Sequence, residues 1–257
     1  MVNKMNSMEK TAYLLCRLGE APYVHGVTEL GKKIDCSKSG TYKLLTALTS
    51  CGLAAKGKDR KYSLGPMVYL LGKTYEQQLG LESIVRPYLS RLRDQTGENA
   101  SFSVVMGGRV VLLYREESFH LVRVAGRAGQ ERPLHAGANG KILGAWRSED
   151  ETKRWLMETP LNAFTERTIT SPEELLREYE KIRKQGYAIS DGELSEETIG
   201  IGAPVVDQAG NVIAAVSLGA PRMRVDSGEK RERYIFLVKE TARELSEALK
   251  GKKTENA

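Results

Sequence analysis

The sequence predicts two modules of different architecture: a small, mostly α-helical N-terminal module that ends in a β-hairpin, and a larger C-terminal α+β domain with an antiparallel sheet. A chain of 257 residues is long enough to build two such cores. Residues 1–80 contain 12 Lys and Arg against 6 Asp and Glu, so they carry the whole formal charge of +6. From Leu81 onwards, extended segments in hairpins are flanked by helices, which is typical of an antiparallel sheet rather than a βαβ repeat.

Two short helices open the first module. Residues 7–19 place apolar side chains near helical spacing, with Ser7 as the expected N-cap. Residues 27–34 form a second helix, for which Thr28 is the expected cap. Both caps are hydroxyl side chains, which can accept a hydrogen bond from the free N–H groups of a first helical turn.

The third helix combines an apolar face with a polar front end. Ser37 is its expected cap, and Gly52 is expected to end it. Residues 53–65 then form two short extended pieces around a basic turn. Three helices followed by a basic hairpin predict a winged helix-turn-helix over residues 1–65.

The front end of the third helix suggests a partner. In a helix-turn-helix protein, the recognition helix enters the major groove of DNA with its N-terminal residues facing the base edges. The alternative is a solvated, lysine-rich surface around an ordinary three-helix core. The charge of the first module favours double-stranded DNA. We expect the contacts to come from the start of the third helix and from the hairpin: Lys38, Ser39, Gly40, Tyr42, Lys43, Lys56, Lys58, Arg60 and Lys61.

A connecting helix is predicted over residues 66–80, with Pro66 at its first position. Its apolar residues serve either as a packing surface for a second subunit or as part of a plain linker. The second module then covers residues 81–257. Its expected helices are 82–96, a segment beginning near Ala138, 149–158, 172–185 and 227–250, and its expected extended pieces are 99–106, 109–116, 120–126, 187–191, 199–207 and 211–219.

Several classes of protein are disfavoured by the composition. The three cysteines, Cys16, Cys36 and Cys51, are odd in number and lack CxxC spacing or a nearby histidine, so we expect buried structural thiols and no metal site. No apolar run reaches the roughly 18 residues that span a membrane. The N-terminus lacks the apolar region of a secretory signal, so we expect a cytoplasmic protein without a membrane partner.

The second module shows no catalytic constellation. His120 and His135 have no cysteine, serine-elbow or carboxylate partner at recognisable spacing, and His135 is expected to be a loop histidine bonded to the backbone. The acidic residues 192–197 are expected to form a solvated loop. No phosphate-binding signature is present. The sequence therefore predicts no catalytic residues and no cofactor.

An ordered set of motifs resembles one family over about residues 7–249. The set resembles the IclR family of bacterial transcriptional regulators. This resemblance implies a winged helix that binds a palindromic operator as a dimer, often within a dimer of dimers, and usually represses. It also implies a GAF-like C-terminal domain that binds a small, usually acidic, metabolite. The motifs are "TELGKKIDCSKSGTYKLLTALTSCGL", "RKYSLG", "RPLHAGANGKIL", "QGYAISDGE", "IGIGAPVVDQAG" and "AAVSLGAP".

The turn into the helix near Ala138 would point the backbone N–H groups of Ala138 and Asn139 outward, which suits a carboxylate. The resemblance implies an effector pocket formed by this turn, by the strand after Tyr187 and by the last two strands. The alternative is that the glycines concerned serve only turns and tight sheet packing. Carried over by position, the pocket residues are Ala138, Asn139, Ser190, Gly200, Ser217 and Gly219, with Asp191 adjacent.

Three glycines depart from the pattern that the family often shows. Gly200 and Gly219 stand where some members have a cysteine or a larger polar residue. Smaller residues leave volume, so we expect a ligand larger or more apolar than a two- or three-carbon keto acid, such as an aromatic or sugar-derived acid. Gly40 stands where members often have a threonine, which removes a potential phosphate contact.

Two other function classes remain as alternatives to a ligand-responsive regulator. One is an enzyme whose basic module serves only oligomerisation or regulation. The other is an interaction protein that uses the winged helix to bind protein. The salt dependence of DNA binding would discriminate among the three, because phosphate contacts release counterions.

Overall fold

The computed structural model describes residues 5–225 and 227–250. The chain forms two compact units, Met1–Leu79 and Gly80–Ala257, which we describe separately. The charged segment 251–257 at the end of the second module lies outside the described residues.

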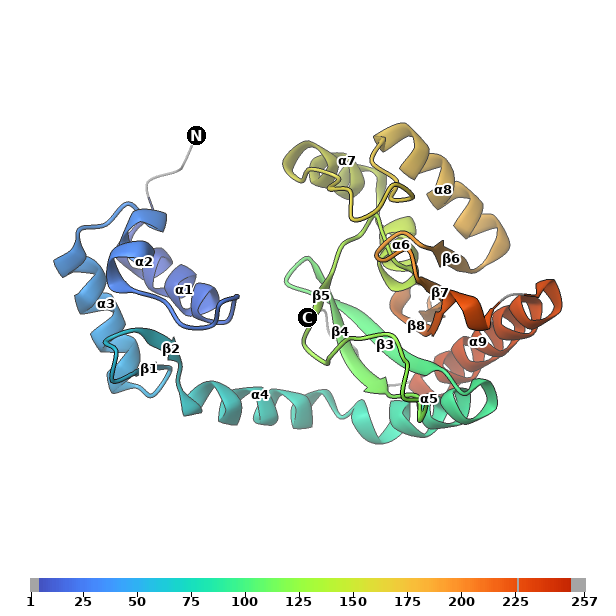
Figure 1. Ribbon diagram of the computed structural model, residues 1–257, viewed down its shortest axis with the longest axis horizontal. Coiled ribbons are helices and arrows are strands. Elements are labelled where there is room, and N and C mark those ends of the chain that lie inside the picture. The colour runs from blue at the N-terminus through green and yellow to red at the C-terminus, as the bar shows by residue number, and fades with distance from the viewer. Residues whose placement is uncertain (1–4, 226, 251–257) are drawn as a thin grey trace. The chain divides into compact units, whose positions relative to one another are not determined.

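The N-terminal unit has the element order that the sequence predicts (Figure 1). Its core joins the three short helices to the hairpin through buried side chains that include Leu14, Leu30, Leu45 and Tyr62. The elements are α1 (Ser7–Leu18), α2 (Val27–Lys33), α3 (Lys38–Ser50), β1 (Ala54–Lys56), β2 (Tyr62–Leu64) and α4 (Pro66–Leu79).

The helix starts differ in part from the predicted caps. Asn6, not Ser7, caps α1, because its side chain accepts the N–H of Glu9 while the Glu9 carboxylate accepts the N–H of Asn6 at 2.6 Å. Helix α2 begins after Gly26 without a side-chain cap, so the prediction for Thr28 is wrong. Ser37 caps α3 as predicted and accepts the N–H of Gly40 at 3.1 Å.

The cysteines are not buried. Cys16 and Cys51 are exposed and Cys36 is half-buried, so the expectation of buried structural thiols is wrong. On α1 the buried positions are Leu14 and Leu18, one helical turn apart, and Cys16 points away from that stripe.

The C-terminal unit is built on one antiparallel sheet of six strands with the order β5-β4-β3-β8-β7-β6. The segment 120–126, expected to be extended, lies instead in the loop between β4 and β5, and Leu121 is 97% exposed there. Side chains rather than a neighbouring strand hold its backbone: Asn99 and Arg115 donate to the carbonyl oxygen of Val124, and Arg224 donates to that of Val122. The strands are β3 (Asn99–Met106), β4 (Arg109–Glu116), β5 (Glu131–Arg132), β6 (Ala188–Asp191), β7 (Thr198–Val206) and β8 (Val212–Pro221).

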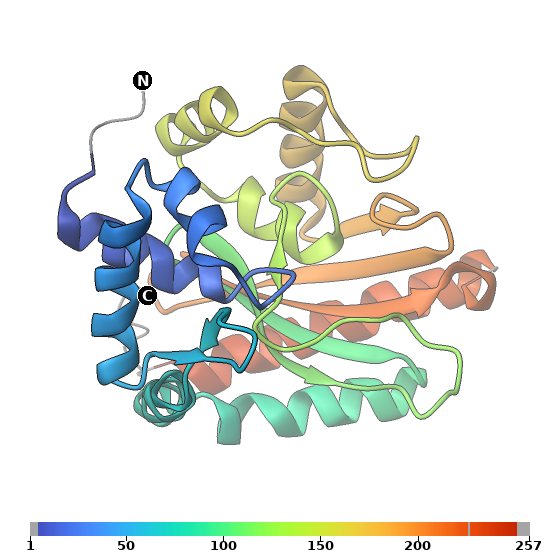
Figure 2. The same cartoon turned by 60° about the vertical axis from the view of Figure 1, so that its left-hand side comes forward.

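Helices cover both faces of this sheet. Helices α5 (Glu82–Thr96) and α9 (Gly228–Leu249) lie side by side on one face, where α9 contacts β7 and β8 while α5 contacts β3 and β4 (Figure 2). On the opposite face α6 (Ala138–Ala145) packs on β7 and β8, and α8 (Pro172–Gln185) packs on α6. The remaining helices are α7 (Glu149–Glu158) and the short 3-10 helix η1 (Arg222–Arg224).

Replacing Leu45 tests the core of the N-terminal unit. Leu45 is 0% exposed, so Leu45→Ala is expected to lower the free energy of unfolding by about 2–5 kcal/mol, through lost burial and a residual cavity. Both tryptophans of the chain, Trp146 and Trp155, lie in the other unit. Urea unfolding followed by circular dichroism should therefore report the change, and tryptophan fluorescence serves to monitor the C-terminal unit separately. Lys43→Ala, an exposed change on the same helix, should stay within about 0.5 kcal/mol of the unaltered protein. If Leu45→Ala lowered the free energy of unfolding by no more than Lys43→Ala does, the place of Leu45 in the core would be contradicted.

Candidate functional site

The first candidate surface is the start of α3. Its inner face is buried through Thr41, Leu45 and Leu48, which leaves the opposite face in solvent. Lys38, Ser39, Tyr42 and Lys43 are all exposed there, and Tyr42 is 48% exposed. Unshielded lysines next to short hydroxyl groups are the chemistry that can meet phosphates and base edges.

The hairpin adds cations next to this helix. The ammonium group of Lys56 lies 5.2 Å from the ring centroid of Tyr42, a cation–π contact that links the hairpin to α3. Lys58, Arg60 and Lys61 are exposed in the turn between β1 and β2. Lys61 also lies 3.9 Å from Asp59, an ion pair too exposed to neutralise the turn.

Gly40 has a packing reason within this helix. A Cβ atom at this position would lie 2.7 Å from the sulfur of Cys36 and 3.2 Å from the Oγ of Ser37. Both atoms belong to side chains, so a larger residue at position 40 would have to displace the Cys36 thiol and the capping hydroxyl of Ser37.

The second candidate site is a cavity of about 290 Å³ in the C-terminal unit. Its floor is one face of the sheet, where strand register aligns two rows of small or polar residues. The first row is Ser190, Gly200, Gly219 and Asn99, and the second is Gly202, Ser217, Ser101 and Arg115. All of these except Gly202 line the cavity, and Gly202 lies against Ala138.

The first turn of α6 forms part of the roof. Gly137 precedes the helix with φ at +81°, a left-handed conformation that glycine adopts readily. Glycine is also required at Gly140, because a Cβ there would lie 1.8 Å from the carbonyl oxygen of Pro133. The backbone N–H groups of Ala138, Asn139 and Gly140 have no acceptor within the helix, since the first intrahelical bond is donated by Lys141. This end of α6 can bind an anion.

A buried ion-pair network fixes this turn from behind. The ammonium group of Lys141, 1% exposed, donates to the carboxylates of Glu193 and Glu178 and to the carbonyl oxygen of Ile189. The second carboxylate oxygen of Glu193 accepts the N–H of Gly137 at 3.1 Å. Glu193 is 7% exposed, so the prediction of a solvated loop over residues 192–197 is wrong at this position. Its lysine partner lies 52 residues away, and this distance hid the pair in the sequence.

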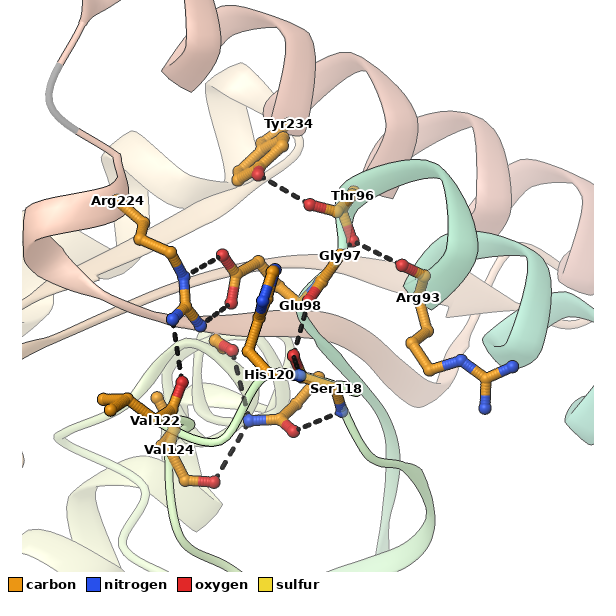
Figure 3. Close-up of polar contacts among 12 residues, drawn as sticks. Arg93, Thr96, Gly97, Glu98, Ser118, His120, Val122, Val124, Arg224 and Tyr234 are labelled. Atoms are coloured by element: carbon orange, nitrogen blue, oxygen red, sulfur yellow. Dashed lines mark hydrogen bonds and ion pairs between the residues drawn. The ribbon is translucent and has the colours of Figure 1, made fainter.

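The loop over residues 117–126 forms another wall and is tied down at several points. Arg224 donates two bonds to the buried carboxylate of Glu98 and a third to the carbonyl oxygen of Val122 (Figure 3). The bonds to Glu98 raise the pKa of Arg224. Asn99 donates to the carbonyl oxygen of Val124 and accepts the N–H of Ser118 at 2.9 Å. Val124 is thereby held where it lines the cavity.

Two arginines and three hydroxyl residues in the cavity wall, Ser101 of β3 among them, were not predicted from the sequence. Arg115 and Arg132 come from β4 and β5, and Ser195 and Thr198 from the segment leading into β7. Burial lowers the pKa of both arginines, and the charge of Arg132 lowers the pKa of Arg115 further. Only the strand register brings the arginines to the cavity face, and in the sequence they look like ordinary surface cations.

The predicted effector residues divide in two. Ala138, Asn139, Ser190, Gly200, Ser217 and Gly219 all line the cavity. Asp191 is not among the lining residues and forms ion pairs with Arg222 at 2.6 Å and Arg231 at 3.1 Å. His135 is bonded to the backbone as predicted, with its Nε2 2.9 Å from the carbonyl oxygen of Asn162. Within the described ranges, no group of three metal-ligating side chains is close enough to hold an ion.

Removing the buried lysine tests the network behind the cavity. Lys141→Met is expected to lower the free energy of unfolding by roughly 3–5 kcal/mol, because it leaves the Glu193 carboxylate buried without its counter-charge. Urea unfolding followed by tryptophan fluorescence measures this change. Lys153→Met is the control, since Lys153 is 65% exposed and its pair with Glu149 spans 3.6 Å, so its effect should stay within about 0.5 kcal/mol. Equal effects of the two changes would refute the structural role of Lys141.

The relatives of this chain are regulators of transcription rather than enzymes. The HTH-type transcriptional regulator KdgR of Escherichia coli is 33% identical over 95% of this chain and 92% of its own length. The transcriptional repressor IclR of Escherichia coli is 26% identical over 96% of this chain and 91% of its own length. No helix in the described part of the chain has the length and apolar character needed to cross a membrane.

The fold leads to the same family. A crystal structure of an IclR transcriptional regulator from Alicyclobacillus acidocaldarius aligns with a TM-score of 0.80 at 27% identity, covering 94% of this chain and 98% of that chain. The family described as "Bacterial transcriptional regulator IclR C-terminal" matches residues 73–247, which include nearly all of the unit that holds the cavity. The chain belongs to the IclR family of bacterial transcriptional regulators.

Proposed function

We propose that this regulator binds a palindromic operator through a winged helix-turn-helix formed by residues 1–65 and a small organic acid through a GAF-like domain formed by residues 81–257. The observation that carries the DNA-binding part is the exposed front end of α3, where Lys38, Ser39, Tyr42 and Lys43 lie in solvent while the opposite face is buried. A recognition helix needs this division, because its N-terminal residues must reach base edges while its back face holds it to the domain.

The wing would contact the DNA backbone beside the groove. Lys56 is held against Tyr42, which would keep the hairpin and the reading helix in one orientation. The exposed cations of the turn, Lys58, Arg60 and Lys61, would meet phosphates there. Such a regulator acts in the cytoplasm of a bacterium, where its operator lies.

The effector would sit in the cavity with its carboxylate at the first turn of α6. The free N–H groups of Ala138, Asn139 and Gly140 supply the donors. The buried Oδ1 of Asn139 accepts no hydrogen bond from the described residues, so it would take a hydroxyl group of the ligand. A Cβ atom at Gly219 would meet no atom within 4 Å, whereas one at Gly200 would lie 3.4 Å from the Cβ of Ala138. The open space beside Gly219 supports a ligand larger than a two- or three-carbon keto acid.

Regulation would follow from a coupling free energy between the two sites. Recognition helices of a dimer fit successive major grooves only at one spacing, so an effector that changes this spacing changes operator affinity. Helix α4 would connect the two domains. Its exposed Tyr69, Leu70 and Leu71 form an apolar surface suited to pairing with a second subunit, in a dimer or a dimer of dimers. We propose repression as the sign of the response.

A double lysine variant tests the reading helix. Lys38→Ala with Lys43→Ala is expected to weaken binding to the promoter of the protein's own gene by at least about tenfold, and to reduce the salt slope by about two, because two phosphate or guanine contacts are lost. Fluorescence anisotropy at several salt concentrations, after footprinting has located the operator, measures both quantities.

Its matched control is Lys181→Ala with Lys184→Ala, which removes the same charge from exposed positions on α8. This control should bind DNA as the unaltered protein does. If the α3 variant also kept its affinity and salt slope, the assigned reading helix would be wrong. A protein-binding role of the winged helix predicts a shallow salt slope for both variants.

Filling the cavity tests the effector site. A Cβ atom at Gly219 would meet no atom within 4 Å, so Gly219→Phe is expected to fold normally while its ring occupies the cavity. Calorimetric titration with benzoate, gluconate, pyruvate and glyoxylate should show binding of the larger acids to the unaltered protein and at least about tenfold weaker binding to the variant. The control is Ala209→Phe, which places the same side chain in an exposed turn and should leave binding intact. The neighbouring Gly210 is avoided because its φ of +84° favours glycine. Tight binding of glyoxylate or pyruvate alone would contradict the larger ligand.

A further inference from the structure

Two cations stand together in the cavity wall without a counter-charge. The Nη1 of Arg115 and the Nη2 of Arg132 lie 2.5 Å and 2.9 Å from the position that a Cβ atom on Gly126 would occupy, so the two guanidinium groups converge on the same point of the wall. Neither forms an ion pair with any of the described residues. Arg115 donates one bond to the carbonyl oxygen of Val124, and its buried Nε has no partner among these residues.

The rest of the cavity does not balance this charge. Among the described residues that line it, Arg115 and Arg132 are the only charged side chains, and the others are apolar, amide or hydroxyl groups or glycines. The nearest acidic residue that influences Arg115, Glu117, is exposed and paired with Arg123 at 3.0 Å. Two partly buried like charges cost free energy unless an anion meets them.

These arginines and the first turn of α6 come from different elements of the fold. Ala138 packs against Gly200 and Gly202 of β7, whereas Arg115 and Arg132 come from β4 and β5 at the other edge of the sheet. Three strand spacings separate β7 from β4, which is roughly 14 Å at the usual spacing of neighbouring strands. Asn139 of this turn also donates to Ser103 of β3 at 2.9 Å, and Gly140 lies against Pro133, the residue after Arg132. The two anion-binding groups are therefore separate parts of one cavity wall.

From this arrangement we infer that the effector carries two anionic groups, one at the first turn of α6 and a second bound by Arg115 and Arg132. The inference rests on the proposed effector function of the cavity and specifies its ligand class: an acid whose second anionic group is a carboxylate or a phosphate. A guanidinium fork matches the oxygen pairs of either group, and two forks at one point select for an anion over a hydroxyl. The open floor of glycines and serines accommodates the connecting atoms.

The test compares acids that differ only in the second charge. Calorimetric titration of the full-length protein would use adipate against hexanoate, with the dicarboxylates from succinate to suberate as a length series, and 6-phosphogluconate against gluconate. The two-anion acid of at least one pair is expected to bind at least about tenfold more tightly than its single-anion partner. A preference confined to the phosphorylated pair identifies the second group as phosphate, and one confined to the dicarboxylates identifies it as carboxylate.

Substitutions assign the preference to the arginines. Arg115→Gln and Arg132→Gln are each expected to reduce the ratio between paired acids to near one, while the affinity for the single-anion acid is kept. Arg177→Gln removes the same charge from an exposed position on α8 and should keep the ratio. Arg132→Gln is also expected to leave the urea midpoint of the ligand-free protein unchanged or higher, because it removes a half-buried cation that has no ion-pair partner among the described residues.

The failures of the two proposals are distinguishable. If single-anion acids bind and the ratio is one in the unaltered protein, the effector function stands and the second anion site is refuted. The second anion site is also refuted if the two-anion acid still binds more tightly than its single-anion partner after each arginine substitution. If neither the single-anion nor the two-anion acids bind, both the effector function of this cavity and the second anion site are refuted.

Discussion

The buried pair between Lys141 and Glu193 is the interaction on which the cavity depends. Glu193 accepts the ammonium group of Lys141 with one oxygen and the N–H of Gly137 with the other, so a single carboxylate fixes both the side chain and the start of α6. Since this carboxylate occupies only the N–H that precedes the helix, the next three remain free to face the cavity. A buried charge is stabilising here only because its partners surround it.

Small residues on one sheet face serve two purposes at once. At Gly202 a Cβ atom would lie 3.2 Å from the Cβ of Ala138, so the small residue permits α6 to approach β7 closely. Gly202 pairs with Ser217 of β8, which in turn pairs with Ser101 of β3. The side chains of these two serines are small, so they leave space in the cavity that they line. The face that admits the helix is therefore also the face that holds the open volume, so helix packing and cavity size are not independent properties of this sheet.

Local signals predicted more of this protein than distant ones. The Ser37 cap, the helix of residues 172–185 and the hairpin of residues 99–116 follow from neighbouring residues, and the structure has each of them. The role of Glu193 could not be predicted, because its partner lies far along the chain and acidic residues in a turn are ordinarily solvated. For the same reason Arg132 was missed: only the pairing of β5 with β4 places it in a wall.

The empty space beside Gly219 has a consequence for how the cavity can change. Because no atom lies within 4 Å of the absent side chain, residues of many sizes fit at this point without disturbing the packed layers on either side. The volume of the cavity and the stability of the fold thus depend on separate positions of one strand, since its neighbour Leu218 is only 1% exposed. Single substitutions at position 219 can change the shape of the cavity while the architecture stays unaltered.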